Sequence, residues 1–170
     1  MQLRRARDSC EQRVLRMAAE FKDRLAAMIA GWIRVGFCQG NFNADNCLVG
    51  GRTMDYGPFG SDCCFEFLHV FHPILLCSGF VDVFDAEWCS WTGGAPHFSF
   101  MNQLQAAHAN FDVFARNLLP LLDAYGVQQM DAIRASFPVS AKMLQNQAMA
   151  AKLGASPALE TFDQLQQTYE

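Results

Sequence analysis

Two oxygen-bearing side chains, Asn46 and Asp55, stand at the two ends of a segment that has the pattern of a β-hairpin. Strand-like runs within 47–54 flank Gly50-Gly51, a dipeptide that favours a two-residue type I′ turn. With that turn, the two residues face each other just beyond the strands, and directly opposed residues have Cβ atoms about 4.5–5.5 Å apart. An amide oxygen and a carboxylate at that separation can share one Mg²⁺, which completes its shell with water and phosphate oxygens.

Asp45 lies beside Asn46 and adds a second carboxylate, which can serve as a base or as an outer-shell metal ligand. The competing interpretation is turn chemistry, because Asn and Asp commonly flank hairpins by capping turns. Spacing alone favours the turn interpretation over the metal site. The predicted register pairs three residues of each strand: Val49 with Arg52, Leu48 with Thr53 and Cys47 with Met54.

The order of these residues matches the layout of a protein-kinase C-lobe. That layout has a catalytic loop with a metal-binding Asn, then a hairpin, then an Asp-aromatic-Gly sequence. Here the loop is 39–46, and the later sequence is Asp55-Tyr56-Gly57. An ordinary kinase loop places its catalytic Asp five residues before the metal-binding Asn. Asn41 occupies that position, so the standard kinase base is missing.

Several motifs, taken together, resemble the selenoprotein O family of protein adenylyltransferases. The loop of that family reads roughly G-F-x-H-G-x-x-N-x-D-N and is followed by x-x-D-Y-G-P, and this chain has similar sequences at 36–46 and 53–58. The similarity continues in order over most of the chain. Later matching runs are Trp91-Thr92-Gly93-Gly94, His97-Phe98-Ser99-Phe100, Met101-Asn102-Gln103, Met130-Asp131-Ala132-Ile133-Arg134 and Lys152-Leu153-Gly154.

The resemblance implies a protein-kinase-like fold that binds ATP in a flipped orientation. It implies transfer of AMP from ATP to Ser, Thr or Tyr hydroxyls of protein substrates. Within this sequence it implies Asp45 as the proton acceptor, and Asn46 and Asp55 as Mg²⁺ ligands, with Asp55 also near the nucleotide. The cation would offset the charge of the phosphates while the base takes the hydroxyl proton.

Two departures from the family pattern concern the site. Gln39 replaces the loop histidine, and a neutral amide can keep a hydrogen bond but cannot titrate near pH 7. The sequence also shows no Gly-rich phosphate loop and no strand lysine with a partner glutamate. We therefore expect the chain, 1–170, to be a single partial domain, a kinase-like C-lobe whose N-lobe is missing.

The third departure is an apolar segment, 61–79, that interrupts the family pattern. In the family, D-Y-G-P-F-G runs almost directly into an F-x-D-x-F-D-like segment, which lies here at 80–85. Deleting 61–79 restores that continuity. The segment is therefore interpreted as an insertion or an unremoved intron, and we expect it to lie outside the helical core, either as a loop or as a poorly determined segment. A genuine surface insertion is the alternative, because long loops cost little closure entropy.

Apolar periodicity predicts a mainly α fold with one short β-hairpin. A first helix is expected from about 9 to 35, ended by Gly36, because apolar residues recur there at steps of three and four. A second begins near Asn102 and should kink or restart at Pro120. Further helices are expected at 127–136, at 140–153 and from 156 to about 168.

Composition narrows the class of protein. The net charge of −4 argues against a nucleic-acid surface, which needs a patch of Lys and Arg. The most apolar window, 63–84, contains Glu66, His69, His72 and Asp82, so no membrane span is expected. Seven cysteines without a C-x-x-C pair suggest reduced thiols in an intracellular protein. By resemblance, that compartment is mitochondrial for a full-length eukaryotic member and cytoplasmic otherwise.

Two functions of different classes follow from the sequence. The first is a nucleotidyltransferase, with ATP and proteins as substrates, of which this chain carries the metal- and base-bearing half. The second is a non-catalytic C-lobe remnant that acts only as a binding or structural module. The motifs favour the first, whereas the missing N-lobe favours the second and predicts that the isolated chain is inactive.

Overall fold

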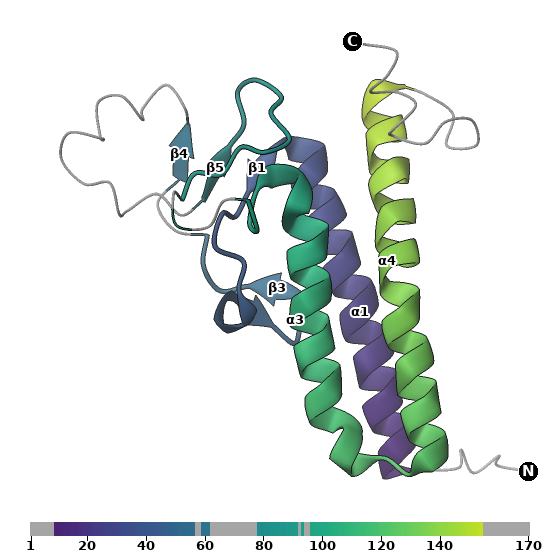
Figure 1. The fold of residues 1–170 in the computed structure, drawn as a ribbon. Coiled ribbons are helices and arrows are strands. Elements are labelled where there is room, and N and C mark those ends of the chain that lie inside the picture. Colours follow the sequence, from purple (N-terminus) through teal and green to yellow (C-terminus); the bar gives the residue numbers. More distant parts are fainter. Residues whose placement is uncertain (1–8, 57–58, 62–77, 92, 94–95, 155–170) are drawn as a thin grey trace, which may run out of the picture.

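The computed structural model describes residues 9–56, 59–61, 78–91, 93 and 96–154. Three long helices run side by side through this part of the chain, and the strands and loops gather beside one half of them (Figure 1). The mainly helical prediction is confirmed. The long helices are α1 (Cys10–Val35), α3 (Gln103–Leu118) and α4 (Ala124–Leu153), and the short 3₁₀ turns are η1 (Ala44–Asn46), η2 (Phe100–Asn102) and η3 (Leu119–Leu121).

Helix α1 begins and ends at the residues that the sequence predicts. Ser9 caps its start, because its hydroxyl accepts from the backbone N–H of Gln12 at 3.1 Å and the Gln12 side chain returns a bond to the Ser9 N–H. Gly36 ends the helix with φ 78°, a left-handed conformation that costs glycine little. Its buried stripe consists of Val14, Leu15, Ala18, Phe21, Leu25, Ala26, Ile29, Ala30, Trp32 and Ile33.

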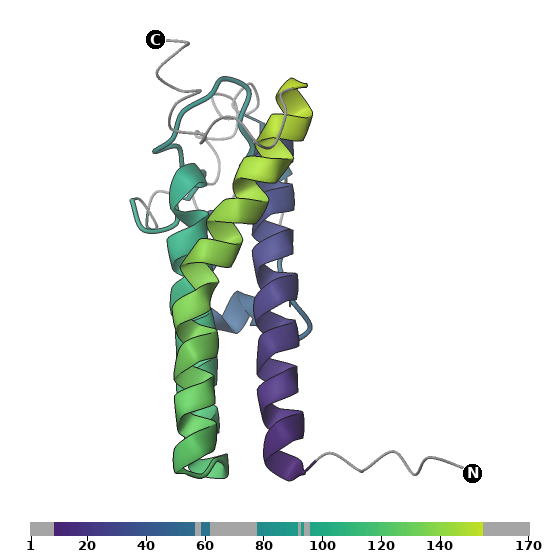
Figure 2. The ribbon, with the colours of Figure 1, turned by 90° about the vertical axis from the view of Figure 1, so that its right-hand side faces the viewer.

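The predicted break at Pro120 is confirmed, and the predicted break further on is wrong. Helix α3 gives way to η3, which contains Pro120, and Asp123 then caps α4 by accepting from the Gly126 N–H at 2.7 Å. The two helices expected at 127–136 and 140–153 are one continuous helix that carries Pro138 inside it. A proline costs an interior hydrogen bond, yet packing against α1 and α3 maintains the helix, which bends along its length (Figure 2). The helix expected from 156 lies outside the described residues.

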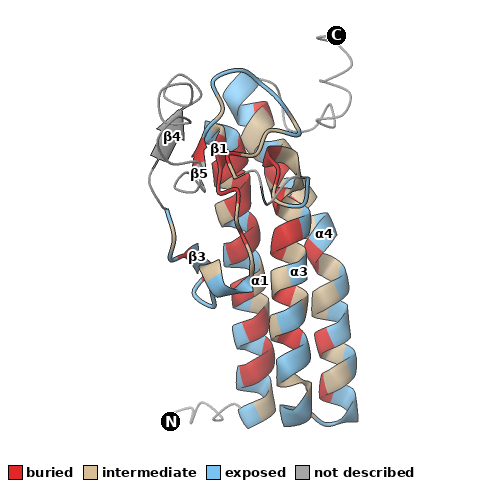
Figure 3. Cartoon of the chain, turned by 60° about the vertical axis from the view of Figure 1, so that its left-hand side comes forward, coloured by how far each residue is buried: buried red, intermediate tan, exposed pale blue. Residues whose placement is uncertain are grey.

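Aromatic rings join the three helices into one core, and buried positions line their facing sides (Figure 3). Phe21 of α1 meets Phe114 of α3 edge to face, with ring centroids 4.9 Å apart. Phe111 of α3 stacks on Phe137 of α4 at 5.5 Å. Such pairs add to the burial of large apolar area, and this helical core is the platform on which the loops rest.

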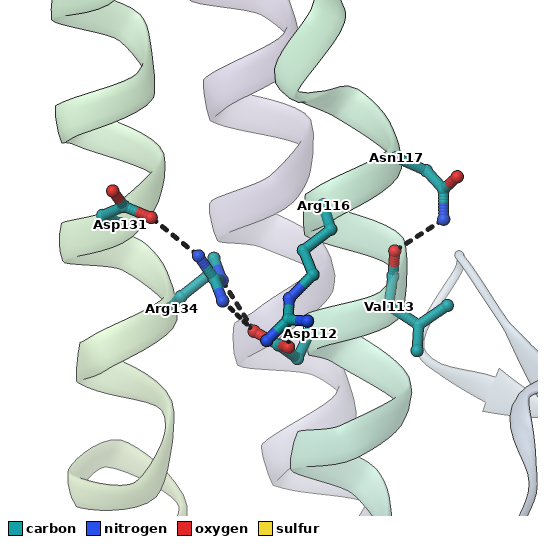
Figure 4. Close-up of polar contacts among 6 residues, drawn as sticks. All are labelled: Asp112, Val113, Arg116, Asn117, Asp131 and Arg134. Atoms are coloured by element: carbon teal, nitrogen blue, oxygen red, sulfur yellow. Dashed lines mark hydrogen bonds and ion pairs between the residues drawn. The ribbon is translucent and has the colours of Figure 1, made fainter.

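An ion-pair cluster on the surface also holds α3 to α4 (Figure 4). The Arg134 guanidinium donates through Nε to Asp112 Oδ1 at 2.7 Å, and its Nη2 lies 2.5 Å from the same oxygen. Arg116 approaches the second Asp112 oxygen at 2.7 Å, while Asp131 contacts Arg134 from its own helix at 2.7 Å. Because Asp112 and Arg134 are both mostly shielded from solvent, this contact fixes the register between the helices better than an exposed pair does.

A small sheet that the sequence analysis did not predict joins both ends of the apolar segment to the end of α1. Strand β5 (Ser78–Phe80) pairs antiparallel with β1 (Phe37–Cys38) and parallel with β4 (Phe59–Ser61). Gly60 lies opposite Gly79, so the chain leaves and returns at neighbouring points. The expectation that 61–79 lies outside the helical core can be compared with the structure only at the ends of the segment. There residue 61 belongs to β4 and residues 78–79 belong to β5, so the ends are strands rather than a loop, while 62–77 lies outside the described residues.

The predicted hairpin is present, but its register is shifted by one residue. Strands β2 (Cys47–Leu48) and β3 (Arg52–Thr53) pair as Cys47 with Thr53 and Leu48 with Arg52. A type I′ turn needs positive φ at both central residues, and only Gly51 has it, at 70°. The Gly51 N–H donates to Leu48 O at 2.9 Å, so the loop has three residues and ends in a left-handed glycine.

Close packing on α1 requires glycine at position 51. A Cβ atom placed there would lie 2.3 Å from the Arg24 Cβ and 3.0 Å from the Arg24 carbonyl carbon. Real Cβ atoms do not approach other atoms so closely. The same glycine thus supplies the left-handed turn and lets the hairpin lie against the helix.

None of the helices in the described part of the chain is long and apolar enough to cross a membrane.

The two turn glycines provide a matched test of this packing. Gly51→Ala adds a clash with the Arg24 backbone and strains a left-handed residue, so we expect it to lower the free energy of unfolding by roughly 2–4 kcal/mol. Gly50→Ala meets nothing within 4 Å and does not have positive φ, so it should change stability little. Urea unfolding of the two variants measures the difference, and equal effects would contradict the hairpin's position.

Candidate functional site

The loop between β1 and η1 is clamped between two helices. Phe42, at the centre of the loop, is 1% exposed and packs its ring edge to face against Trp32 of α1, with centroids 5.1 Å apart. From the other side, Asn110 of α3 donates through Nδ2 to the Phe42 carbonyl at 2.9 Å. The loop is thereby fixed by an apolar contact and a hydrogen bond from different elements.

Two buried glutamine side chains connect this loop to its surroundings. Gln103 at the start of α3 donates to the carbonyls of Phe37 and Phe100, both at 3.0 Å, and accepts from the Gln39 N–H at 3.0 Å. The Gln39 side chain accepts from the Asn41 N–H at 2.8 Å and donates to the Asp55 carbonyl at 3.2 Å. Both side chains are almost completely buried, so these bonds replace solvent that neither group can reach.

Three asparagines shape the end of the loop. Asn43 caps η1 by accepting from the N–H groups of Asp45 and Asn46 at 3.1 and 3.2 Å. The Asn46 amide donates through Nδ2 to the Asn41 carbonyl at 2.8 Å. This bond orients the Asn46 side chain, and its Oδ1 accepts no hydrogen bond from the described residues. An oriented carbonyl oxygen of this kind can coordinate a cation.

The predicted face-to-face pairing of Asn46 with Asp55 is wrong. The observed register, continued outward, sets Asp55 opposite Asp45, and η1 removes both Asp45 and Asn46 from the strand ladder. The Asn46 and Asp55 backbones nevertheless meet at the Thr53 hydroxyl. Its Oγ1 lies 2.9 Å from Asn46 O and 3.3 Å from Asp55 O, and it accepts from the Asp55 N–H at 3.2 Å. One side chain thus holds the two residues together across the open end of the hairpin.

The two carboxylates differ in their surroundings. Asp45 is exposed and lies inside η1, where Asn43 and not Asp45 provides the cap. Its carboxylate forms no hydrogen bond or ion pair with the described residues. Asp55 is half-buried, and its backbone is held on one side by Gln39 and on the other by Thr53. Asp45 thus presents an exposed carboxylate, whereas Asp55 is held in place through its backbone.

Sequence reasoning singled out Gln39, Asp45, Asn46 and Asp55 and missed the residues that position them. Gln103 was read only as part of a motif, and Thr53 only as a strand residue. Both are nearly buried polar side chains, at 1% and 6% exposure. A signal was present for Gln103, because a polar residue on the helix face that also carries Ala106, Ala107 and Phe111 must find hydrogen-bond partners.

The donor set suits a small hard cation that keeps part of its shell for other ligands. Mg²⁺ prefers oxygen, and one amide oxygen with one carboxylate leaves positions for water and phosphate oxygens. Across the residues that the structure describes, no three His, Cys, Asp or Glu side chains gather into a cluster of the kind that holds a metal by protein ligands alone. Asn46 and Asp55 supply the donor types of a site that keeps positions open for other ligands, one amide oxygen and one carboxylate.

Comparisons with known proteins agree with the motifs. A family model described as protein adenylyltransferase SelO matches residues 5–169. The protein nucleotidyltransferase YdiU of Burkholderia pseudomallei (strain 1106a) is 31% identical over 153 residues, which cover 82% of this chain and 26% of the relative. The YdiU of Burkholderia vietnamiensis (strain G4 / LMG 22486) is 35% identical over 144 residues, which cover 77% and 24%.

The YdiU of Burkholderia multivorans (strain ATCC 17616 / 249) is 34% identical, again with 77% of this chain and 24% of the relative covered. This chain thus spans about a quarter of the length of the curated relatives that it matches. The family match, by contrast, extends over nearly the whole chain. The chain belongs to the SelO family of protein adenylyltransferases.

Proposed function

We propose that this chain is the metal- and base-bearing part of a nucleotidyltransferase that moves AMP from ATP to protein hydroxyls. The relatives' description as protein nucleotidyltransferases supports the reaction class. The observation that carries the proposal for this chain is the Thr53 contact. It ties Asn46 to Asp55 and leaves the exposed carboxylate of Asp45 alongside.

In this proposal the loop and hairpin correspond to the lower, C-lobe half of a kinase-like cleft. Asn46 Oδ1 and the Asp55 carboxylate would hold Mg²⁺, which supplies charge compensation for the phosphates of ATP. Asp45 would accept the proton of the substrate hydroxyl as that oxygen attacks the α-phosphorus of ATP. A new P–O bond then forms, the bond to the β-phosphate breaks, and pyrophosphate leaves. Exposure suits this role, because a protein substrate must reach the base.

Gln39 would act as a positioning residue. In the family pattern a histidine stands at its place, and here the buried amide holds the backbones of Asn41 and Asp55 at the same time. Those contacts use the amide's donor and acceptor without any charge. The proposed site therefore does not depend on a titrating side chain at position 39.

The second candidate function is a binding or structural module without catalysis. The matching region is only 26% of the length of the Burkholderia pseudomallei relative, which favours the module for the isolated chain. Positioning ATP needs groups that bind all of its phosphates. The two functions are separated by replacing the matching segment of the full-length Burkholderia pseudomallei relative with this chain. Mg²⁺-dependent incorporation of labelled AMP by the exchanged protein supports the transferase, and its complete absence in a folded exchanged protein supports the module.

Substitution of the two carboxylates, one at a time, in that exchanged protein should separate effects on ATP binding from effects on AMP transfer. Asp55→Asn is expected to abolish Mg²⁺-dependent ATP binding, measured by calorimetry, because a metal ligand loses its charge. Asp45→Asn should leave the ATP Kd within about threefold and slow AMP transfer by roughly 10²–10⁴-fold, because a base acts in the chemical step. Asp23→Asn, on the exposed face of α1, serves as the control and should change neither quantity. Loss of ATP binding in Asp45→Asn would contradict the assigned roles.

Gln39 can be tested on this chain by stability alone. Gln39→Leu leaves the Asn41 N–H and the Asp55 carbonyl without their partner, which should cost roughly 1–3 kcal/mol in free energy of unfolding. Gln39→His restores either a donor or an acceptor, so it should lower the free energy of unfolding by less than Gln39→Leu does. Gln128→Leu, at an exposed position of α4, is the control. The positioning role is wrong if the two leucine variants unfold at the same denaturant concentration.

A further inference from the structure

Two cysteines that are distant in sequence meet behind the loop. Cys38 in β1 is completely buried, and its thiol lies 3.8 Å from the Trp88 carbonyl and 3.4 Å from the Phe98 carbonyl. Cys89 is half-buried, and its thiol lies 3.6 Å from the Gly40 carbonyl and 3.3 Å from the Trp91 carbonyl. The Cys38 thiol thus contacts the residue next to Cys89, and the Cys89 thiol contacts a residue two positions from Cys38, so the two thiols lie close together.

The pKa values of the two thiols shift in opposite directions. The hydrogen bond from Cys38 lowers the pKa of Cys89 to about 7, against the opposing effect of burial, and the Trp91 backbone assists. The same hydrogen bond, together with burial, raises the pKa of Cys38 far above its usual range. No carboxylate or basic side chain of the described residues contributes to the Cys89 shift, so it arises from the second thiol and the backbone.

We propose that Cys38 and Cys89 are a disulfide-forming pair, in which Cys89 is the nucleophilic thiol and Cys38 the resolving thiol. The assignment follows from geometry, because an oxidant can reach the half-buried Cys89 but not the enclosed Cys38. Each thiol already contacts the backbone within two residues of the other cysteine, so the two sulfurs need only a small approach to reach bonding distance. The inference concerns the thiols themselves and does not rest on the transfer reaction.

The oxidant would be a peroxide. The Cys89 thiolate attacks one peroxide oxygen, the O–O bond breaks, and the thiolate becomes a sulfenic acid as the other oxygen leaves as water after taking up a proton. The Cys38 sulfur then attacks the sulfenic sulfur, an S–S bond forms, and the hydroxyl leaves as a second water with the Cys38 proton. In total, two thiols lose two electrons and two protons, and one peroxide becomes two waters.

The bond would connect β1 to the segment that carries Cys89, directly behind the loop. Cys38 immediately precedes Gln39, and the Cys89 thiol now contacts the Gly40 carbonyl. Oxidation would withdraw that thiol from Gly40 and fix the start of the loop covalently. The chain also offers an internal comparison, because burial alone raises the pKa of Cys47, in β2, to about 11.

The first test needs no variant. The reduced, folded chain is treated with iodoacetamide across pH 5–9, and each cysteine peptide is quantified by mass spectrometry. We expect Cys89 to be alkylated with a midpoint near pH 7, whereas Cys47 stays slow throughout that range. Equal reactivity of Cys89 and Cys47 would overturn the proposal.

The second test identifies the bond. Treatment of the chain with a few equivalents of hydrogen peroxide should produce one cross-linked peptide pair, Cys38 with Cys89, that dithiothreitol separates. Cys89→Ser should abolish this cross-link, and Cys47→Ser, the control, should retain it. Cys38→Ala should leave Cys89 to oxidise further and should move its alkylation midpoint upward. Pairing of Cys89 with another cysteine, or its oxidation to sulfinic acid while Cys38 is present, would refute the pairing.

Discussion

The site depends on one buried amide, the Gln39 side chain, which holds two backbones that the fold brings together from different directions. Its carbonyl oxygen orients the loop at Asn41, and its NH₂ group holds the strand exit at Asp55. Because water cannot reach it, neither bond has a solvent substitute, and the loss of one partner leaves the other group unsatisfied. Gln103 fixes this amide in turn through the Gln39 N–H, so the start of α3 determines where the site lies.

The helices supply the rigidity that such a hydrogen-bond chain needs. Helix α1 contributes Trp32 against the loop and the close approach at Arg24 against the hairpin, while α3 contributes Gln103 and Asn110. Both helices are held by the common aromatic core and by α4. The proposed ligands therefore lie on short irregular segments whose positions are determined by long regular ones, which is the usual way in which a scaffold positions functional loops.

Local sequence signals predicted most of the helical architecture, because caps and breaks act over a few residues. Gly36 and Pro120 ended helices where expected, whereas Pro138 did not, since packing along α4 outweighed a single proline. The hairpin was found, but its register was misjudged because Gly50-Gly51 suits two turn types and only contact with α1 selects between them. The sheet of β1, β5 and β4 was missed because its pairing is non-local and each strand is very short. Motifs identified the candidate site residues in the sequence. The roles of Thr53 and Gln103 were missed because they depend on burial in the folded chain, which a local sequence pattern does not show.

The central claim is that Asn46 and Asp55 converge on one cation although the strand register does not pair them. A crystal structure of the exchanged full-length relative with Mg²⁺ and a non-hydrolysable ATP analogue tests it most directly. The account predicts Asn46 Oδ1 and an Asp55 carboxylate oxygen at about 2.0–2.1 Å from one Mg²⁺ that also binds phosphate oxygens. It also predicts that the Asp45 carboxylate stays outside that inner shell and faces the α-phosphate. A cation bound by Asp45 and Asp55 without Asn46, or a nucleotide bound away from the hairpin, would contradict it.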